Sequence, residues 1–122
     1  MSQTSPIKVL ALGLPLPKEM DPDGDMASKI KAGAAQNNID LNLRIVDVEN
    51  QSHEKITDDL KETLKDGPYD VVSIGFGVRG DPKLTEIFEK LVNTVSQVQP
   101  GARFAFLTHP QDMFAAVKRV MA

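Results

Sequence analysis

Four apolar segments alternate with four helical patterns along this chain, and that alternation constrains its fold more than any other feature. The apolar segments cover residues 7–13, 39–45, 69–74 and 103–107. Between and after them lie helical patterns at about residues 26–37, 53–64, 82–98 and 113–121. Strands that alternate with helices through short connections form a parallel sheet covered by helices. The sequence therefore predicts an α/β fold, a three-layer sandwich around a four-stranded parallel sheet.

The apolar content of each strand predicts its place in the sheet. The first and third segments are apolar almost throughout, as strands covered on both faces are, so we expect them at the centre. Residues 39–45 alternate strictly between apolar and polar, which suits an edge strand. With right-handed crossovers, the predicted strand order is 2-1-3-4, a flavodoxin-like arrangement that lacks the usual fifth strand.

Size and composition predict a single domain over residues 1–122, in which residues 1–6 precede the first strand and are disordered. The net charge of −3 gives no basic footprint for nucleic acid and no polybasic patch for a membrane surface. There is no cysteine, which excludes disulfides and thiolate chemistry. The N-terminal residues do not resemble a signal peptide, so we expect a cytoplasmic protein.

The most conspicuous motif, Gly75-Phe76-Gly77-Val78-Arg79-Gly80-Asp81-Pro82, lies between the third strand and the next helix. Glycines let the backbone approach a ligand closely, and the N–H groups at a helix start favour anions. Asp81 and Pro82 are suited to the N-cap and first turn of that helix. The spacing Gly-x-Gly-x-x-Gly matches a dinucleotide fingerprint in letters only, because it follows the third strand and no ribose-binding acid follows the fourth.

Other polar residues are expected at the same end of the sheet, where the strand order reverses and α/β sheets bind ligands. Lys18 follows the first strand, while Thr108 and His109 follow the fourth. His53 is expected at this end as well, but no spacing supports a metal site. His109 also precedes Pro110 and can serve as a helix N-cap. The predicted ligand-binding residues are Gly75, Gly77, Arg79, Gly80, Asp81, Lys18 and Thr108, with His109 as the candidate catalytic residue.

From Tyr69 onward the chain resembles a group of small, mainly bacterial flavodoxin-like proteins to which no activity has been assigned. The resemblance rests on residues 69–72, the Gly-x-Gly-x-Arg loop, Asp81-Pro82, residues 88–93 and a strand that ends in Thr108-His109-Pro110. It implies a fold and a site location. The group carries other residues where this chain has His109, so the resemblance does not extend to a catalytic role for that histidine.

These observations predict a protein that binds a small anionic metabolite between the first and third loops, with Arg79 and backbone N–H groups holding the anion. Two alternatives stay open. One is an enzyme with His109 as general acid–base and Arg79 as oxyanion holder. The other is a non-catalytic module that forms a homodimer through the exposed fourth strand or the adjoining helix. The sequence names no cofactor.

Overall fold

The computed structural model describes residues 5–122 of the chain. Residues 1–4, most of the segment expected to be disordered, lie outside the described residues. The strands are β1 (Ile7–Gly13), β2 (Ile39–Ile45), β3 (Val71–Ile74) and β4 (Arg103–Phe106). The helices are α1 (Met26–Gln36), α2 (His53–Leu64), α3 (Phe76–Arg79), α4 (Thr85–Val98) and α5 (Met113–Met121), with 3₁₀ turns η1 (Pro82–Leu84) and η2 (Pro110–Asp112).

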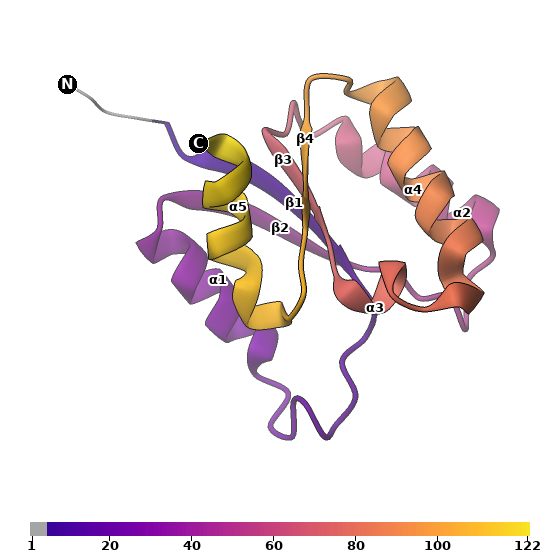
Figure 1. Cartoon of the computed structure of the whole chain (residues 1–122), viewed down its shortest axis with the longest axis horizontal. Helices are drawn as coiled ribbons and strands as arrows, with labels where there is room; N and C mark the ends of the chain where they lie inside the picture. Colours follow the sequence, from indigo (N-terminus) through magenta and orange to yellow (C-terminus); the bar gives the residue numbers. More distant parts are fainter. Residues whose placement is uncertain (1–4) are drawn as a thin grey trace.

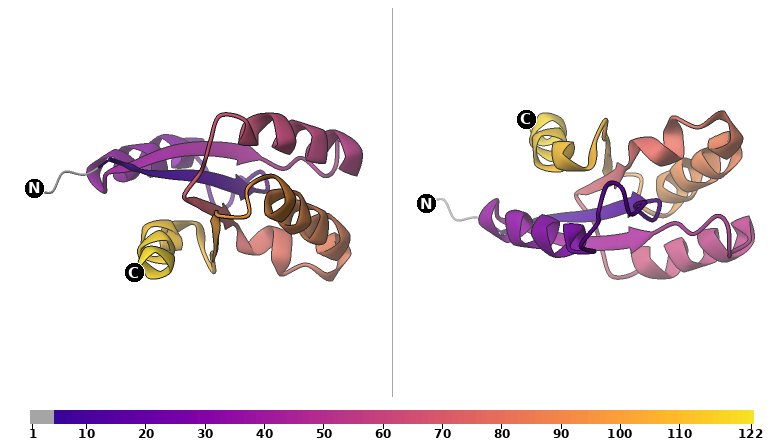
Figure 2. Two further views of the ribbon diagram at one scale, coloured as in Figure 1. Left: turned by 90° about the horizontal axis from the view of Figure 1, so that it is seen from above. Right: turned by 90° about the horizontal axis from the view of Figure 1, so that it is seen from below.

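The sheet confirms the predicted topology. All its strand pairs are parallel and their order is β2-β1-β3-β4, so β1 and β3 are central and β2 and β4 are edges. Helices α1 and α5 cover one face, and α2 and α4 cover the other (Figures 1 and 2). The three-layer α/β sandwich is therefore the architecture of this chain.

Alternation along β1 divides the core into two parts, because successive side chains of a strand point to opposite faces. Leu10 and Leu12 pack with α2 and α4, while Val9 and Ala11 pack with α1 and α5. β3 divides in the same way, with Val72 and Ile74 on the first face and Val71 on the second. This parity decides which residues at the strand ends face each helical layer.

The glycine-rich segment after β3, expected as a loop before the next helix, is partly helical. Residues Phe76–Arg79 form the short helix α3, in which the Val78 N–H donates to the Gly75 carbonyl and the Gly80 N–H to the Phe76 carbonyl. Val78 is fully buried against the core and anchors this turn. The Asp81 side chain accepts from the Lys83 N–H, which confirms its capping role, but it caps η1 rather than α4.

The segment between β1 and α1 projects beyond the carboxyl end of the sheet (Figure 1). Asp25 occupies the N-cap position of α1 but makes no side-chain cap bond. The Asp21 carboxylate instead accepts from the Met26 N–H over 3.1 Å. Asp21 therefore fastens the end of this segment to the start of α1.

No helix among residues 5–122 is long and apolar enough to cross a membrane.

Candidate functional site

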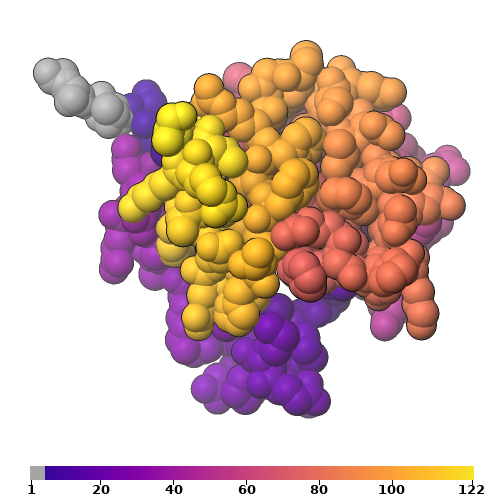
Figure 3. Space-filling model, viewed as in Figure 1, coloured from indigo at the N-terminus to yellow at the C-terminus, as the bar shows by residue number. Residues whose placement is uncertain are grey.

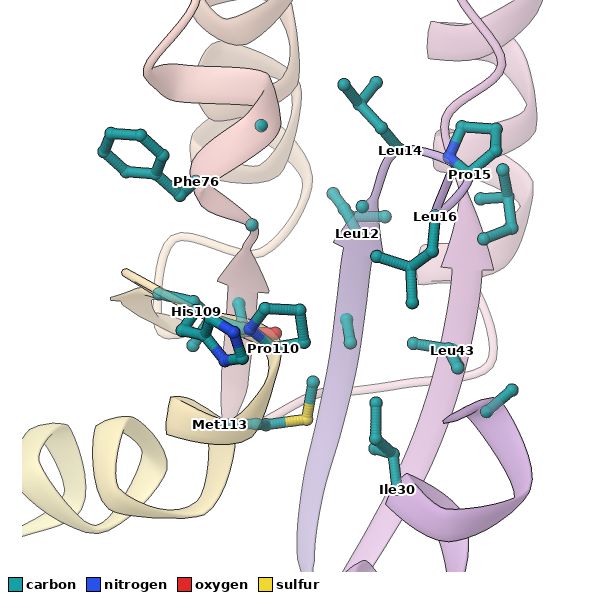
Figure 4. Close-up of a pocket in the computed structure, with 18 of the residues that line it drawn as sticks. Leu12, Leu14, Pro15, Leu16, Ile30, Leu43, Phe76, His109, Pro110 and Met113 are labelled. Carbon is teal, nitrogen blue, oxygen red and sulfur yellow. The ribbon is translucent and has the colours of Figure 1, made fainter. Parts of the chain in front are cut away.

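A cavity of about 430 Å³ opens at the carboxyl ends of β1 and β3, on the face that α1 and α5 cover. This is the point at which the strand order reverses, where open α/β sheets bind their ligands. Figure 4 shows its two sides: Pro110 and Met113 face Leu16, Leu43 and Ile30 across the end of β1. The cavity is thus built by the β1–α1 segment, α1, β2 and the β4–α5 connection.

Small residues on the two central strands form the floor of the cavity. Ala11 and Gly13 on β1 lie beside Ser73 and Gly75 on and after β3, and Ala11 is the register partner of Ser73. Strand alternation places all of them on the α1 and α5 face, because Val9 and Val71 pack there. A Cβ added at Gly13 would meet no atom within 4 Å. The cavity therefore exists because these residues have small side chains or none and leave the space above the sheet unfilled.

Ser73 is the polar group at the bottom of this floor. Ser73 is 0% exposed, and its Oγ has no hydrogen-bond partner among residues 5–122. Leaving a buried hydroxyl unpaired costs about 1–3 kcal/mol, so nearly all such groups in folded proteins have a partner. An unpartnered Oγ that lines a cavity is suited to a bond with a bound molecule.

His109 lies on the α5 side of the cavity beside Pro110 (Figure 4). It was expected as the N-cap of the last helix but caps the 3₁₀ turn η2 before α5, where its Nδ1 accepts a hydrogen bond from the Gln111 N–H over 3.1 Å. A neutral imidazole with Nδ1 as acceptor carries its hydrogen on Nε2. As long as this cap bond is made, His109 offers a ligand a hydrogen-bond donor.

Thr108, which also lines the cavity, is tied to the start of α5. Its backbone N–H and its Oγ1 lie 3.4 and 3.3 Å from Asp112 Oδ2. When the hydroxyl donates to the carboxylate, its oxygen keeps acceptor capacity. Thr108 and His109 are therefore both held in place by contacts to the turn that follows them.

Arg79 does not line the cavity. Its Nη2 donates to the Leu107 carbonyl over 3.3 Å, and its guanidinium carbon lies 5.1 Å from the centre of the Phe76 ring and 5.8 Å from that of Phe106. The Nε atom is buried with no partner among the described residues. These contacts give Arg79 a role in bracing α3 against β4.

The remaining predicted site residues divide into two groups. Gly75 and Gly77 line the cavity, whereas Gly80, Asp81 and Lys18 do not. A Cβ at Gly80 would lie 2.6 Å from the Phe76 ring and 2.9 Å from the Phe76 carbonyl oxygen, so packing alone accounts for that glycine. Of the residues predicted for the site, the cavity thus brings together Gly75, Gly77, Thr108 and His109.

His53 is separate from this cavity, contrary to the clustering expected for the two histidines. It begins α2, and its Nδ1 lies 3.2 Å from Glu86 Oε2 on α4, in the helical layer on the other face of the sheet. Among residues 5–122 no three histidine or carboxylate side chains gather closely enough to hold a metal ion.

Sequence reasoning missed the apolar walls of the cavity and the importance of Ser73. Leu14, Leu16 and Met20 resemble loop residues in the sequence, but they line the cavity. Ser73 is the only polar residue in the run from Val71 to Ile74, and that isolated hydroxyl was an available signal.

Comparison of the chain with protein-family models, with curated proteins and with solved structures finds no match. The resemblance to the small bacterial group therefore stays a prediction, and a function can be inferred from the geometry of the cavity alone.

Proposed function

We propose that this protein binds a small organic molecule with an apolar body and one carboxylate or carbonyl end in the cavity at the carboxyl ends of β1 and β3. The observation that carries the proposal is the buried, unpartnered Oγ of Ser73 at the floor of a cavity of about 430 Å³. Cavities of roughly 300–1,000 Å³ with apolar walls and a few polar groups are typical of small-molecule sites.

The walls favour an apolar body for the ligand. Most of the side chains around the cavity are aliphatic or thioether groups, among them Leu14, Leu16, Ile30, Leu43, Met20 and Met113. Burying apolar surface there contributes about 25 cal/mol per Å² to the free energy of binding. A highly hydrated ligand such as inorganic phosphate gains nothing from these walls.

The polar groups favour an oxygen acceptor at one end of the ligand. The Ser73 hydroxyl and the His109 Nε2–H can both donate, and an ionised or carbonyl oxygen accepts from such donors. Arg79 and Lys18, the cations expected to hold an anion, lie outside the lining, and its charged members, Arg44 and Asp21, are one of each sign. A single carboxylate therefore suits the site better than a phosphate. The proposed ligand class is thus more specific than the anionic metabolite predicted from the sequence.

The enzyme alternative receives less support. It needs Arg79 as an oxyanion holder, but the Arg79 guanidinium is engaged by the Leu107 carbonyl and by the rings of Phe76 and Phe106. His109 remains available as a donor, which a binding site uses as readily as a catalytic one.

A pair of glycine variants tests the proposal. Gly13→Val places a side chain in the open space of the cavity, and Gly101→Val is its control because a Cβ there also meets nothing within 4 Å, in the turn before β4 far from the cavity lining. Octanoate, phenylacetate and inorganic phosphate serve as probes in ligand-observed NMR titrations.

We expect either carboxylate to bind the wild type and Gly101→Val equally, and Gly13→Val at least about tenfold more weakly, a loss of about 1.4 kcal/mol. Phosphate should not compete. Absence of binding by both carboxylates, or equal binding to Gly13→Val and the control, would refute the assignment of the ligand class to this cavity.

A further inference from the structure

The outer edge of β4 carries main-chain groups that the sheet leaves unpaired. The N–H groups of Arg103 and Leu107 donate toward β3, to the carbonyls of Asp70 and Ile74. Because backbone direction alternates along a strand, Phe104 and Phe106 direct their N–H and carbonyl groups away from the sheet. Among residues 5–122 the Phe106 carbonyl accepts one long bond, of 3.4 Å from Arg119, and a carbonyl can accept a second one.

This edge is also unusually basic for the protein. Two of the four arginines in the sequence, Arg103 and Arg119, lie along it and Arg79 lies at its end, although the chain has a net charge of −3. Arg103 belongs to β4 itself, Arg119 reaches the Phe106 carbonyl, and Arg79 reaches the Leu107 carbonyl. Among residues 5–122 none of these arginines forms an ion pair with a carboxylate. The charges of Arg103 and Arg119 are available to a partner, whereas the Arg79 guanidinium is held by the Leu107 carbonyl and the rings of Phe76 and Phe106.

The two sides of the edge differ in chemistry. On the α5 side, Arg103 lies against Met121 and Arg119 extends from α5. On the α4 side, Phe106 stacks on Phe104 with ring centres 6.0 Å apart and meets the edge of the Phe88 ring at the same distance. Phe106 is 38% exposed and Phe76, on the adjoining α3, is 50% exposed. Figure 3 shows β4 open at the surface between α5 and α4.

We propose that this edge binds an extended acidic segment of a partner protein, which joins the sheet as a strand next to β4. Main-chain bonds to Phe104 and Phe106 would supply affinity, as in other cases of strand addition to a sheet edge. Since side chains of the added strand alternate between the two sides, its carboxylates face Arg103 and Arg119 while its apolar residues cover the phenylalanine rings. The preferred sequence therefore alternates acidic and apolar residues.

Charge argues for this occupant over a second copy of the chain, the homodimer expected from the sequence. Antiparallel pairing of two β4 strands about Ala105 would bring Arg103 opposite Leu107 of the second copy. Arg103 would then approach Arg79 and Arg119 of that copy, which contact its Leu107 and Phe106 carbonyls. Like charges placed close together oppose association. The acidic chain as a whole also disfavours nucleic acid.

The test uses fluorescently labelled peptides and fluorescence anisotropy. The peptide Glu-Val-Glu-Val-Glu-Val is compared with Lys-Val-Lys-Val-Lys-Val and with an oligonucleotide of mixed sequence. The double variant Arg103→Gln with Arg119→Gln removes both exposed cations on the α5 side. Arg44→Gln, which neutralises the fourth arginine on the opposite edge strand β2, is the matched control.

We expect the acidic peptide to bind the wild type and the Arg44 variant alike, and the double variant at least about tenfold more weakly, with affinity falling as salt is raised. Amide exchange at Phe104 and Phe106 should slow when the peptide is bound. The proposal is overturned if the acidic peptide does not bind, if the lysine peptide or the oligonucleotide binds as well, or if the double variant binds normally. Self-association of the chain that the peptide cannot displace would assign the edge to a second copy and would also overturn it.

Discussion

The Arg79 guanidinium donates a hydrogen bond to the main-chain carbonyl of Leu107 over 3.3 Å, and this contact ties α3 to the end of β4. The guanidinium also lies near the rings of Phe76 and Phe106, where a cation–π contact contributes about 0.5–2 kcal/mol. Thr108 and His109 follow Leu107 directly and line the cavity. Arg79 therefore stabilises the segment that carries these two cavity-lining residues without lining the cavity itself.

Replacing Arg79 should reduce stability because its contacts are internal. Arg79→Met keeps much of the apolar stem but loses the hydrogen bond and the charge over the rings, and we expect a loss of about 1–2 kcal/mol in the free energy of unfolding. Arg79→Lys should recover only part of it, because an ammonium lacks the planar donor fork. Urea denaturation measures both variants. Wild-type stability in Arg79→Met, combined with lost carboxylate binding, would instead make Arg79 a ligand contact.

Ser73→Ala should change stability and binding in opposite directions. Removing an unpartnered buried hydroxyl relieves its desolvation cost, so the ligand-free protein should be as stable as the wild type or more stable by about 1 kcal/mol. The affinity for octanoate or phenylacetate should fall, because the donor is lost. Thermal unfolding without probe measures the change in stability, and titration with probe measures the change in affinity. A clear loss of stability in the free protein would mean that Ser73 has a structural partner.

Two substitutions at His109 should distinguish its capping role from a binding role. His109→Ala removes the Nδ1 acceptor for the Gln111 N–H and should cost about 1 kcal/mol, as for other N-caps. Asparagine is a preferred cap residue, so His109→Asn should restore stability. If Nε2–H donates to the ligand, the asparagine variant stays stable but binds the carboxylate probes more weakly; full affinity in that variant would leave His109 with the cap alone.

Two glycines of the same segment should respond differently to alanine. At Gly75 the backbone has φ −69° and ψ 155°, and an added Cβ would lie 3.7 Å from its nearest atom, the Leu12 carbonyl oxygen. Gly75→Ala should therefore change stability by less than about 1 kcal/mol. Gly80→Ala forces a Cβ against Phe76 and should cost about 1–3 kcal/mol. Parallel denaturant titrations compare the two, and equal effects would contradict the packing described for α3.

The fold could be predicted from the sequence because burial leaves a direct trace in residue pattern. The apolar runs of β1 and β3 and the alternation from Ile39 to Ile45 mark central and edge strands, and the structure confirms the order. The spacing of Ile56, Leu60 and Leu64 likewise predicted a helix that buries those residues.

The site could be predicted only in part, because sequence gives the position of a residue along the chain but not the direction of a long side chain. Arg79 follows β3 as expected, yet its guanidinium turns toward the Leu107 carbonyl rather than the cavity. The glycines suggested a loop before the next helix, whereas residues 76–79 form a short helix with Val78 buried. The cavity itself arises from side chains that are absent at Gly13 and Gly75, and sequence alone does not show which space stays empty.

Backbone amide chemical shifts recorded during a titration with phenylacetate show whether the cavity binds a small carboxylate. If the cavity binds the probe, saturable shift changes will cluster at Gly13, Ser73, Gly75 and His109, with none of comparable size at His53 on the other face of the sheet. Saturable changes centred on α2 and α4, or no saturable change at any of these amides, would show that the cavity does not bind the probe.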